Sequence, residues 1–318
     1  MSELVILADV VRSGFVEGHH RGSVVVTDPD GTVSWSVGIT DQPMFPRSSN
    51  KPMQAVGMLR HGLPLEDELL ALAGASHSGE QFHLDGVRRI LALAKLDESA
   101  LQTPIAYPLD DAARDAWVRA GHGQERVVMN CSGKHAAMLL TCTLNDWSLE
   151  NYREPDHPLQ QAIRVAVEDA AGEKVSYVAV DGCGAPIFAI SLAGLARAFG
   201  MYAAAAPGTH ERQVADAFRA HPAYASGSTR DEYELMRDTA GVFCKAGAEG
   251  VYAVGLPDGR GIALKLEDGT PRARKVVMAA VLQRLGVTNP TIESHLQFAL
   301  TGGDNIVGAV QPHAPAFG

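Results

Sequence analysis

Apolar residues near the N-terminus follow the two-residue period of β-strands. In residues 33–37 apolar side chains alternate with serines, and the turn Asp28–Gly31 separates this segment from the valine run 24–26. Two apolar runs around a turn of this composition indicate a β-hairpin. Residues 3–39 are therefore expected to form strands.

The same kind of pattern returns later in the chain. Residues 251–255 and 261–266 are apolar runs on either side of the turn 257–259, which consists of Pro, Asp and Gly. This arrangement predicts a second hairpin. A continuous apolar segment at 175–180 predicts a further strand that is buried.

Elsewhere, apolar residues recur at the spacing of amphipathic helices. Helices are expected at residues 48–61, 65–73, 80–95, 111–120, 134–142, 157–171, 187–199, 209–220, 229–238 and 271–285. Strands thus cluster toward both ends of the chain, and helices fill the middle. The expected fold class is α+β, with an antiparallel sheet formed by both chain ends and helices on its faces. No linker or repeat divides residues 1–318, which are expected to form one unit.

The composition narrows the choice of partners. Apolar residues make up 46% of the 318 residues and charged residues 20%, which is typical of folded rather than disordered proteins. The net charge of −10 opposes binding to nucleic acid, and no apolar run approaches the roughly 20 residues that span a membrane. The N-terminal residues lack the features of a secretory signal, so a cytoplasmic location is expected. The sequence does not decide the oligomeric state, and a homodimer stays open.

Ser48 and Lys51 lie three residues apart at the start of an expected helix, so their side chains share one helix face. A neutral lysine can take the hydroxyl proton of a serine that attacks a carbonyl carbon. The positive end of the helix stabilises the developing negative charge. Taken alone, the pattern also fits a capped helix with a solvated lysine, and Ser49 is an alternative nucleophile.

Two other segments contain polar groups of the same kind. Ser76 lies in residues 74–80, where small and hydroxyl residues surround a histidine. This segment fits an active-site loop or a helix cap. Lys245 precedes a run of small residues before the second hairpin. It either faces a pocket across the sheet or lies on the surface beside a turn.

Four further residues form a candidate metal site. Cys131 and Lys134 lie at the start of an expected helix, whereas Asp181 and Cys183 follow a strand. Two thiolates, a carboxylate and a neutral amine or imidazole, the latter from the adjacent His135, would make a four-coordinate set that suits zinc. Because no Cys-x-x-Cys motif is present, two unrelated buried cysteines remain an alternative, and a disulfide is a third option that the expected compartment opposes. Cys142 is expected in the core.

Together these segments resemble the serine-type L-asparaginase II family. The matching motifs occur in the family's order and span nearly the whole chain: Pro46–Pro52, Ala75–Ser78, Asn130–His135, Asp181–Cys183, His221–Pro222, Lys245–Gly250 and Ile262–Gly269. The resemblance implies a fold like that of the serine β-lactamases and penicillin-binding proteins. It also implies one catalytic unit that hydrolyses L-asparagine to L-aspartate and ammonia.

The resemblance assigns catalytic roles as two serine–lysine pairs. One pair is Ser48 with Lys51, and the other is Ser76 with Lys245. In the implied mechanism, Ser48 attacks the side-chain amide while Lys51 removes its proton, and water later releases aspartate from the serine ester. The sequence does not decide which lysine activates that water.

Substrate contacts and a zinc site follow from the same resemblance. Arg47 and Asn130 flank the catalytic residues and are the expected substrate contacts. The implied ligands of about one zinc ion per chain are Cys131, Lys134, Asp181 and Cys183. Because four ligands close the coordination shell, this zinc is expected to position the substrate or to stabilise the fold.

Three other functions stay open on the sequence. A glutaminase would act on a substrate that is longer by one methylene, a difference that enzymes discriminate by only about 1–3 kcal/mol. A β-lactamase-like hydrolase would share the fold. A zinc-stabilised binding protein would bind ligand without turnover.

Overall fold

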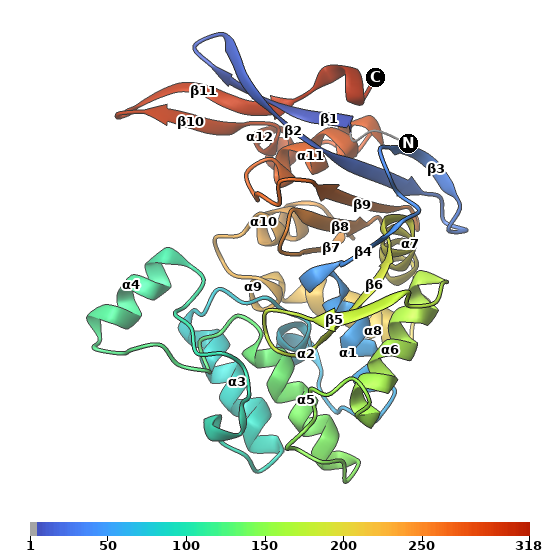
Figure 1. Cartoon of the computed structure of the whole chain (residues 1–318), viewed down its shortest axis with the longest axis vertical. Coiled ribbons are helices and arrows are strands. Elements are labelled where there is room, and N and C mark those ends of the chain that lie inside the picture. The colour runs from blue at the N-terminus through green and yellow to red at the C-terminus, as the bar shows by residue number, and fades with distance from the viewer. Residues whose placement is uncertain (1–4) are drawn as a thin grey trace.

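In the computed structural model, which describes residues 5–318, both ends of the chain build one antiparallel sheet (Figure 1). The strand order is β10-β11-β1-β2-β9-β8-β7, and β3 pairs with β2. The strands are β1 (Val5–Arg12), β2 (Phe15–Thr27), β3 (Val33–Val37), β7 (Phe243–Ala246), β8 (Val251–Gly255), β9 (Gly261–Leu266), β10 (Phe298–Gly302) and β11 (Asn305–Pro312). This sheet confirms the expected α+β class. Residues 3 and 4 of the first expected strand region lie outside the described residues.

Both expected hairpins are present. β2 and β3 pair across the turn Asp28–Gly31, and β8 pairs with β9 across the turn 257–259. The sequence pattern does not predict β10 and β11, because most of their side chains are at least partly exposed and no apolar run marks them. They are nevertheless joined to the sheet through the pairing of β11 with β1.

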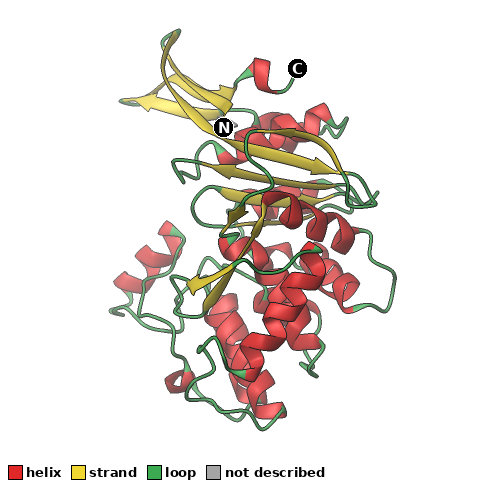
Figure 2. Cartoon of the chain, turned by 45° about the vertical axis from the view of Figure 1, so that its right-hand side comes forward, coloured by secondary structure: helices red, strands yellow, loops and turns green. Residues whose placement is uncertain are grey.

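Helices form most of the rest of the molecule, and Figure 2 shows a helical region next to the sheet. Helix α1 packs against α5, α6 and α8, whereas α7 and α11 pack against strands of the sheet. The helices are α1 (Lys51–Leu59), α2 (Asp67–Ala73), α3 (Gln81–Leu93), α4 (Asp111–Arg119), α5 (Ser132–Leu144), α6 (Pro158–Ala171), α7 (Leu192–Ala203), α8 (His210–Ala220), α9 (Pro222–Ala225), α10 (Asp231–Asp238), α11 (Arg274–Arg284) and α12 (Pro290–His295), with the 3₁₀ turns η1 (Arg47–Asn50), η2 (Glu98–Ala100) and η3 (Ala314–Ala316).

The helix expected at 187–199 is wrong in its first part. Residues Pro186–Ser191 form strand β6, and α7 begins only at Leu192. All six residues of β6 are buried. A short, continuous apolar run of this kind has the same appearance in a buried strand and in a buried helix. The hydroxyl of Ser191 marks the boundary, because it accepts a hydrogen bond of 2.9 Å from the backbone N–H of Gly194 and caps α7.

The strand expected at 175–180 exists, but it is not buried. Strand β5 (Tyr177–Val180) lies at the edge of a small sheet of order β4-β6-β5, in which β4 is Pro43–Met44. The side chains of Tyr177 and Val180 are 65% and 72% exposed. The apolar residues of this segment therefore predicted the strand correctly, but the prediction that the strand is buried was wrong.

Helix α7 lies unusually close to the sheet strands that lead to the candidate site. A Cβ atom on Gly255 would lie 2.0 Å from the carbonyl oxygen of Phe199, so only glycine allows this approach. The contact fixes β8, and β8 in turn pairs with β7, which contains Lys245.

Within the part of the chain that the structure describes, every helix is too short or too polar to cross a membrane.

Candidate active site

Ser48 lies in a tight turn between the sheet and the first helix. The segment expected as one helix at 48–61 is in fact the turn η1, which contacts β7 and β8, followed by α1. Arg47 precedes Ser48 and has a φ of +51°. This left-handed conformation is uncommon for a residue with a Cβ atom, and such strain occurs often at functional sites.

The two neighbouring serines have different surroundings. Ser49 is fully buried, and its hydroxyl donates a hydrogen bond of 3.0 Å to the carbonyl oxygen of Lys245. Ser48 is partly exposed and lines a cavity. Of the two hydroxyls, the one on Ser48 is therefore the one that a substrate can reach.

The cavity beside Ser48 has a volume of about 320 Å³ and brings together segments that are far apart in the sequence. Its polar lining includes Ser48, Ser76, Asn130, Arg230, Glu249 and Arg274. A space of this size suits one small molecule.

Lys51 lies behind this cavity and is only 1% exposed. Its Nζ atom donates hydrogen bonds to the hydroxyl of Ser76 at 2.9 Å, to the carbonyl oxygen of Ala75 at 2.6 Å and to the sulfur of Cys131 at 3.1 Å. Three acceptors thus surround the Nζ atom, which accounts for the burial of this side chain.

The structure connects the expected catalytic residues differently from the implied pairs. Over residues 5–318, no hydrogen bond joins Lys51 to Ser48 or Lys245 to Ser76. Instead, the hydroxyl in direct contact with Lys51 is that of Ser76. Ser48 and Ser76 line the same cavity. The roles of these four residues remain predictions.

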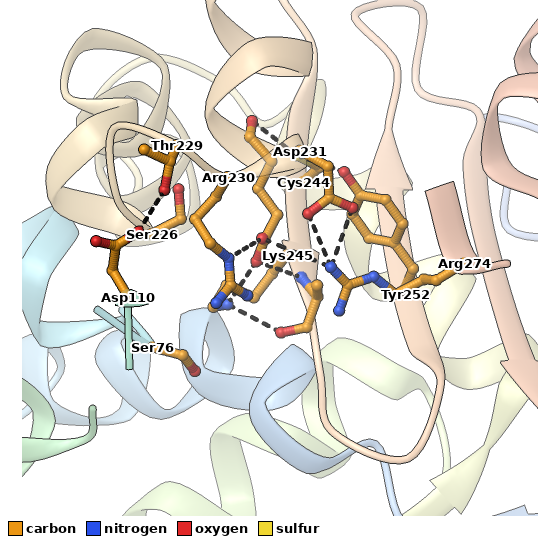
Figure 3. A network of polar contacts seen from close by, with 12 residues as sticks. Ser76, Asp110, Ser226, Thr229, Arg230, Asp231, Cys244, Lys245, Tyr252 and Arg274 are labelled. Atoms are coloured by element: carbon orange, nitrogen blue, oxygen red, sulfur yellow. Dashed lines mark hydrogen bonds and ion pairs between the residues drawn. The ribbon is translucent and has the colours of Figure 1, made fainter. Parts of the chain in front are cut away.

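Lys245 is fully buried in β7 and belongs to a network of charges with α10. Its Nζ atom donates to Glu232 at 3.0 Å and to the carbonyl oxygen of Ala246 at 2.9 Å. The second carboxylate oxygen of Glu232 accepts a hydrogen bond of 3.1 Å from Nε of Arg230. Figure 3 shows that Arg230 and Lys245 converge, with Ser76 on a neighbouring segment.

Burial and the neighbouring charges in this network shift the pKa values of Glu232 and Lys245. Burial opposes ionisation of Glu232, but the positive charges of Arg230, Lys245 and Arg274 outweigh it and hold the pKa of this carboxyl well below its usual range. Burial lowers the pKa of Lys245 to about 8, although the carboxylate of Glu232 opposes part of this change. Lys245 therefore loses its proton much more readily than an ordinary lysine.

Three of the four expected zinc ligands converge beside Lys51. Cys131 and Cys183 belong to one small buried cluster, and Nζ of Lys134 donates to the sulfur of Cys183 at 3.1 Å. A hydrogen bond from the Cys131 thiol, helped by the charge of Lys134, holds the pKa of Cys183 below its ordinary value. Thiolate sulfur and lysine nitrogen are donors that zinc accepts once the nitrogen has lost its proton.

Within residues 5–318, Asp181 makes no side-chain hydrogen bond to these three residues, although its charge acts on Lys134. Its carboxylate accepts a hydrogen bond of 2.8 Å from Nε of Arg47, whose Nη1 lies 3.4 Å from Glu249. The described residues contain no group of three or more His, Cys, Asp or Glu side chains arranged to hold a metal. Arg47 thus contacts a residue that lines the cavity, whereas Asn130 lines it directly.

His135 is a further donor beside the sulfurs. Its Nδ1 shares a hydrogen bond of 2.8 Å with the hydroxyl of Tyr152, and its Nε2 is buried without a partner among residues 5–318. Burial lowers the pKa of His135 to about 4, although a hydrogen bond with Cys183 acts in the opposite direction. The imidazole is therefore neutral at neutral pH, as a metal ligand must be. The converging side chains and this unpartnered nitrogen are donors that zinc accepts, but no metal-holding group of His, Cys, Asp and Glu side chains forms among residues 5–318, so the zinc site stays a prediction.

The chain belongs to the L-asparaginase II family, whose model matches residues 8–312. It is therefore an amide hydrolase that acts on a small molecule. Comparison with the curated proteins found no match.

Several solved structures are similar to this chain. A β-lactamase from Mycobacterium bovis has 15% sequence identity and a TM-score of 0.46, covering 82% of this chain and 94% of its own. A Bacillus glutaminase has 13% identity and a TM-score of 0.38, covering 84% of this chain and 91% of its own. The hydrolase EstCE1, which is described as having promiscuous acyltransferase activity, has 10% identity and a TM-score of 0.44, covering 81% and 92%.

The sequence did not single out Glu232 or Arg230. Both lie at the start of α10, in the run Arg230–Glu232. Acidic residues are common in the first turn of any helix, where they interact favourably with its positive end. Lys245 contacts the first turn of α10 only because of the way the sheet and α10 pack in the folded chain. No local sequence signal therefore distinguished Arg230 and Glu232 from ordinary surface charges.

We expect Glu232→Gln to reduce the free energy of unfolding by about 3–5 kcal/mol, because it leaves buried cations without their shared carboxylate. Urea unfolding of the parent and the variant measures the difference. Glu234→Gln on the same helix is the matched control, since Glu234 is 42% exposed and its carboxylate pairs with His295; it should change the stability little. Equal stabilities for the parent and Glu232→Gln would contradict the role of the buried carboxylate.

Proposed function

We propose that this protein hydrolyses L-asparagine to L-aspartate and ammonia through an ester with Ser48. The observation that carries the proposal is the shared cavity: Ser48 and Ser76 line it, and Lys51 lies buried behind it in contact with Ser76. An accessible hydroxyl, a second hydroxyl and a lysine are the groups that acyl transfer to serine requires. Family membership supports an amide as the substrate.

In the first step, Oγ of Ser48 forms a bond to the amide carbon. The proton of Ser48 passes by way of the Ser76 hydroxyl to Lys51, which starts the step in its neutral form. The same path returns the proton to the amide nitrogen, the carbon–nitrogen bond breaks, and ammonia leaves. Ser76 takes this place in the proposal because it, and not Ser48, is hydrogen-bonded to Lys51.

In the second step, water attacks the aspartyl ester. One proton of the water moves to a lysine, the ester bond breaks, and Ser48 regains its proton as aspartate leaves. Lys245 is the proposed base for this step, because burial gives it a pKa of about 8. It is then partly neutral at the pH at which a cytoplasmic enzyme works.

We propose that Cys131, Lys134 and Cys183 hold a zinc ion when one is bound, with Asp181 or His135 as the fourth ligand. Such a closed shell would balance the negative charges of the two thiolates and supply a rigid link between α5 and the segment after β5. Lys134 has to give up its proton to bind zinc, so the metal would replace that proton beside the thiolate of Cys183.

We expect Ser48→Ala to abolish ammonia release from L-asparagine, because no acyl-enzyme can form. Ser76→Ala should keep a residual rate that is about 10²–10⁴-fold lower than that of the parent, since it removes only proton transfer. Ser49→Ala is the matched control and should stay active. The assay measures ammonia release from L-asparagine and L-glutamine and the colour change of a chromogenic β-lactam, with thermal unfolding as a check of folding.

Activity in Ser48→Ala together with its loss in Ser49→Ala would move the nucleophile by one residue. Faster release from glutamine, or turnover of the β-lactam alone, would replace asparagine as the proposed substrate. Binding without turnover of any of them would favour a zinc-stabilised binding protein.

We expect elemental analysis to find about one zinc per chain in the purified protein. The double variant Cys131→Ser, Cys183→Ser should lose it, because two of the converging donors are then missing. Cys142→Ala is the control, since Cys142 is a core residue of α5 and should leave the zinc content unchanged. The same zinc content in the double variant would remove both cysteines as ligands.

We expect kcat to rise between about pH 7 and pH 9, because Lys245 has a pKa of about 8 and activates water for hydrolysis of the ester only after losing its proton. The charged groups that face it are Glu232, Arg230 and Lys51. Lys245→Arg cannot lose this proton and should be inactive throughout.

The comparison uses pH–rate profiles of the parent, of Lys245→Arg and of Lys174→Arg. Lys174 is 87% exposed and serves as the control for a lysine-to-arginine change. A parent profile that is flat over this range, or an active Lys245→Arg, would exclude Lys245 as the base.

A further inference from the structure

We propose that Arg230 binds the carboxylate of the substrate and so restricts the enzyme to small amides that carry a free carboxylate group. The inference rests on the proposed function, since it concerns the same cavity. It adds a residue that selects the substrate, and it defines the chemical class that this residue accepts.

Arg230 reaches the cavity from the start of α10. It lines the same space as Ser48 and Ser76, and its side chain is 23% exposed. Its Nε atom donates to Glu232, and no other side-chain hydrogen bond of Arg230 occurs within residues 5–318. The two terminal nitrogens of its guanidinium group therefore remain available to a ligand.

The other two guanidinium groups near the cavity are already engaged. Nε of Arg47 donates to Asp181, and its Nη1 lies 3.4 Å from Glu249. Arg274 donates from Nη2 to both carboxylate oxygens of Asp231, at 2.8 and 3.0 Å. Figure 3 shows this pair of Arg274 and Asp231 beside Arg230. Arg230 differs because its hydrogen bond to Glu232 uses only the Nε atom.

The charges around Arg230 favour an anion over a cation. The carboxylate of Glu232 is shared with Lys245, and Arg274 lies 3.9 Å from it. Since Arg274 is already paired with Asp231, the one carboxylate of Glu232 is left to balance both Lys245 and Arg230. A ligand carboxylate would supply the missing negative charge, and the planar guanidinium group can bind it through two parallel hydrogen bonds.

The size of the cavity connects this contact to the reaction. Because Ser48 and Arg230 line one space of about 320 Å³, a single small molecule can place its amide at the serine and its carboxylate at the arginine. L-asparagine has both groups, whereas 3-aminopropanamide is asparagine without the α-carboxylate. The two compounds isolate the contact with Arg230.

The experiment compares the parent with Arg230→Gln and Arg230→Lys in the full-length protein. Ammonia release gives kcat/KM for L-asparagine and for 3-aminopropanamide. Arg230→Gln should lower the value for asparagine by about 10- to 100-fold more than the value for 3-aminopropanamide, the size expected for a hydrogen-bonded ion pair, because any effect on Lys245 applies to both substrates. Arg230→Lys keeps the positive charge but lacks the two parallel donors of the guanidinium group. Its kcat/KM for asparagine should therefore lie between those of the parent and Arg230→Gln. Arg237→Gln, an exposed arginine of the same helix that pairs with Asp238, is the control.

Calorimetric binding separates this inference from the proposed function. L-aspartate and β-alanine differ by the same α-carboxylate, and their binding requires no turnover. A parent that releases no ammonia would refute the proposed activity, while weaker binding of aspartate alone to Arg230→Gln would still support the anchor. Equal losses for both members of either pair, or an unchanged affinity of Arg230→Gln for aspartate, would overturn it. A parent that binds no carboxylate would overturn it as well, and thermal unfolding identifies a variant that fails to fold.

Discussion

The arrangement of this protein depends on keeping three lysines out of water. Lys51 and Lys134 are 1% exposed and Lys245 is fully buried. A buried ammonium group is stable only where acceptors or opposite charges surround it, because its desolvation costs several kcal/mol. Each lysine has different hydrogen-bond partners. Lys51 donates to a hydroxyl, a carbonyl oxygen and a sulfur, Lys134 donates to the sulfur of Cys183, and Lys245 donates to Glu232. These partners determine how each lysine can take part in the chemistry of the site.

These partners come from elements that are distant in the sequence, so the fold itself has to bring them together. Lys51 begins α1, Ser76 follows α2, and Lys245 lies in β7. The turn η1 rests on β7 and β8, and α7 holds β8 in place through the close approach at Gly255. A substitution far from the cavity that moved β7 would therefore separate Lys245 from Glu232 and leave both charges buried and unpaired.

The spacing of apolar residues, every second residue in strands and every three to four residues in helices, predicted both hairpins, most helices and the sheet formed by the two chain ends. The predictions failed where the spacing of apolar residues did not reflect the secondary structure or the burial of the segment. Residues 186–190 are all apolar, so the spacing of apolar residues could not distinguish a strand from a helix. Strands β10 and β11 are too exposed to show a pattern of apolar residues. For the site, motifs identified the lysines, serines and cysteines. They could not identify Glu232 or the contact between Lys51 and Ser76, because both depend on tertiary contacts between distant segments.

The shared carboxylate of Glu232 makes binding and catalysis dependent on each other. One of its oxygens accepts from Lys245 and the other from Arg230. The charge of Arg230 is one of the influences that lower the pKa of Lys245. On the proposal that a substrate carboxylate binds Arg230, its negative charge would offset that influence and make Lys245 hold its proton more strongly in the complex than in the free enzyme. Release of the product anion would then reverse the effect, so the lysine would be most ready to lose its proton when the cavity is empty.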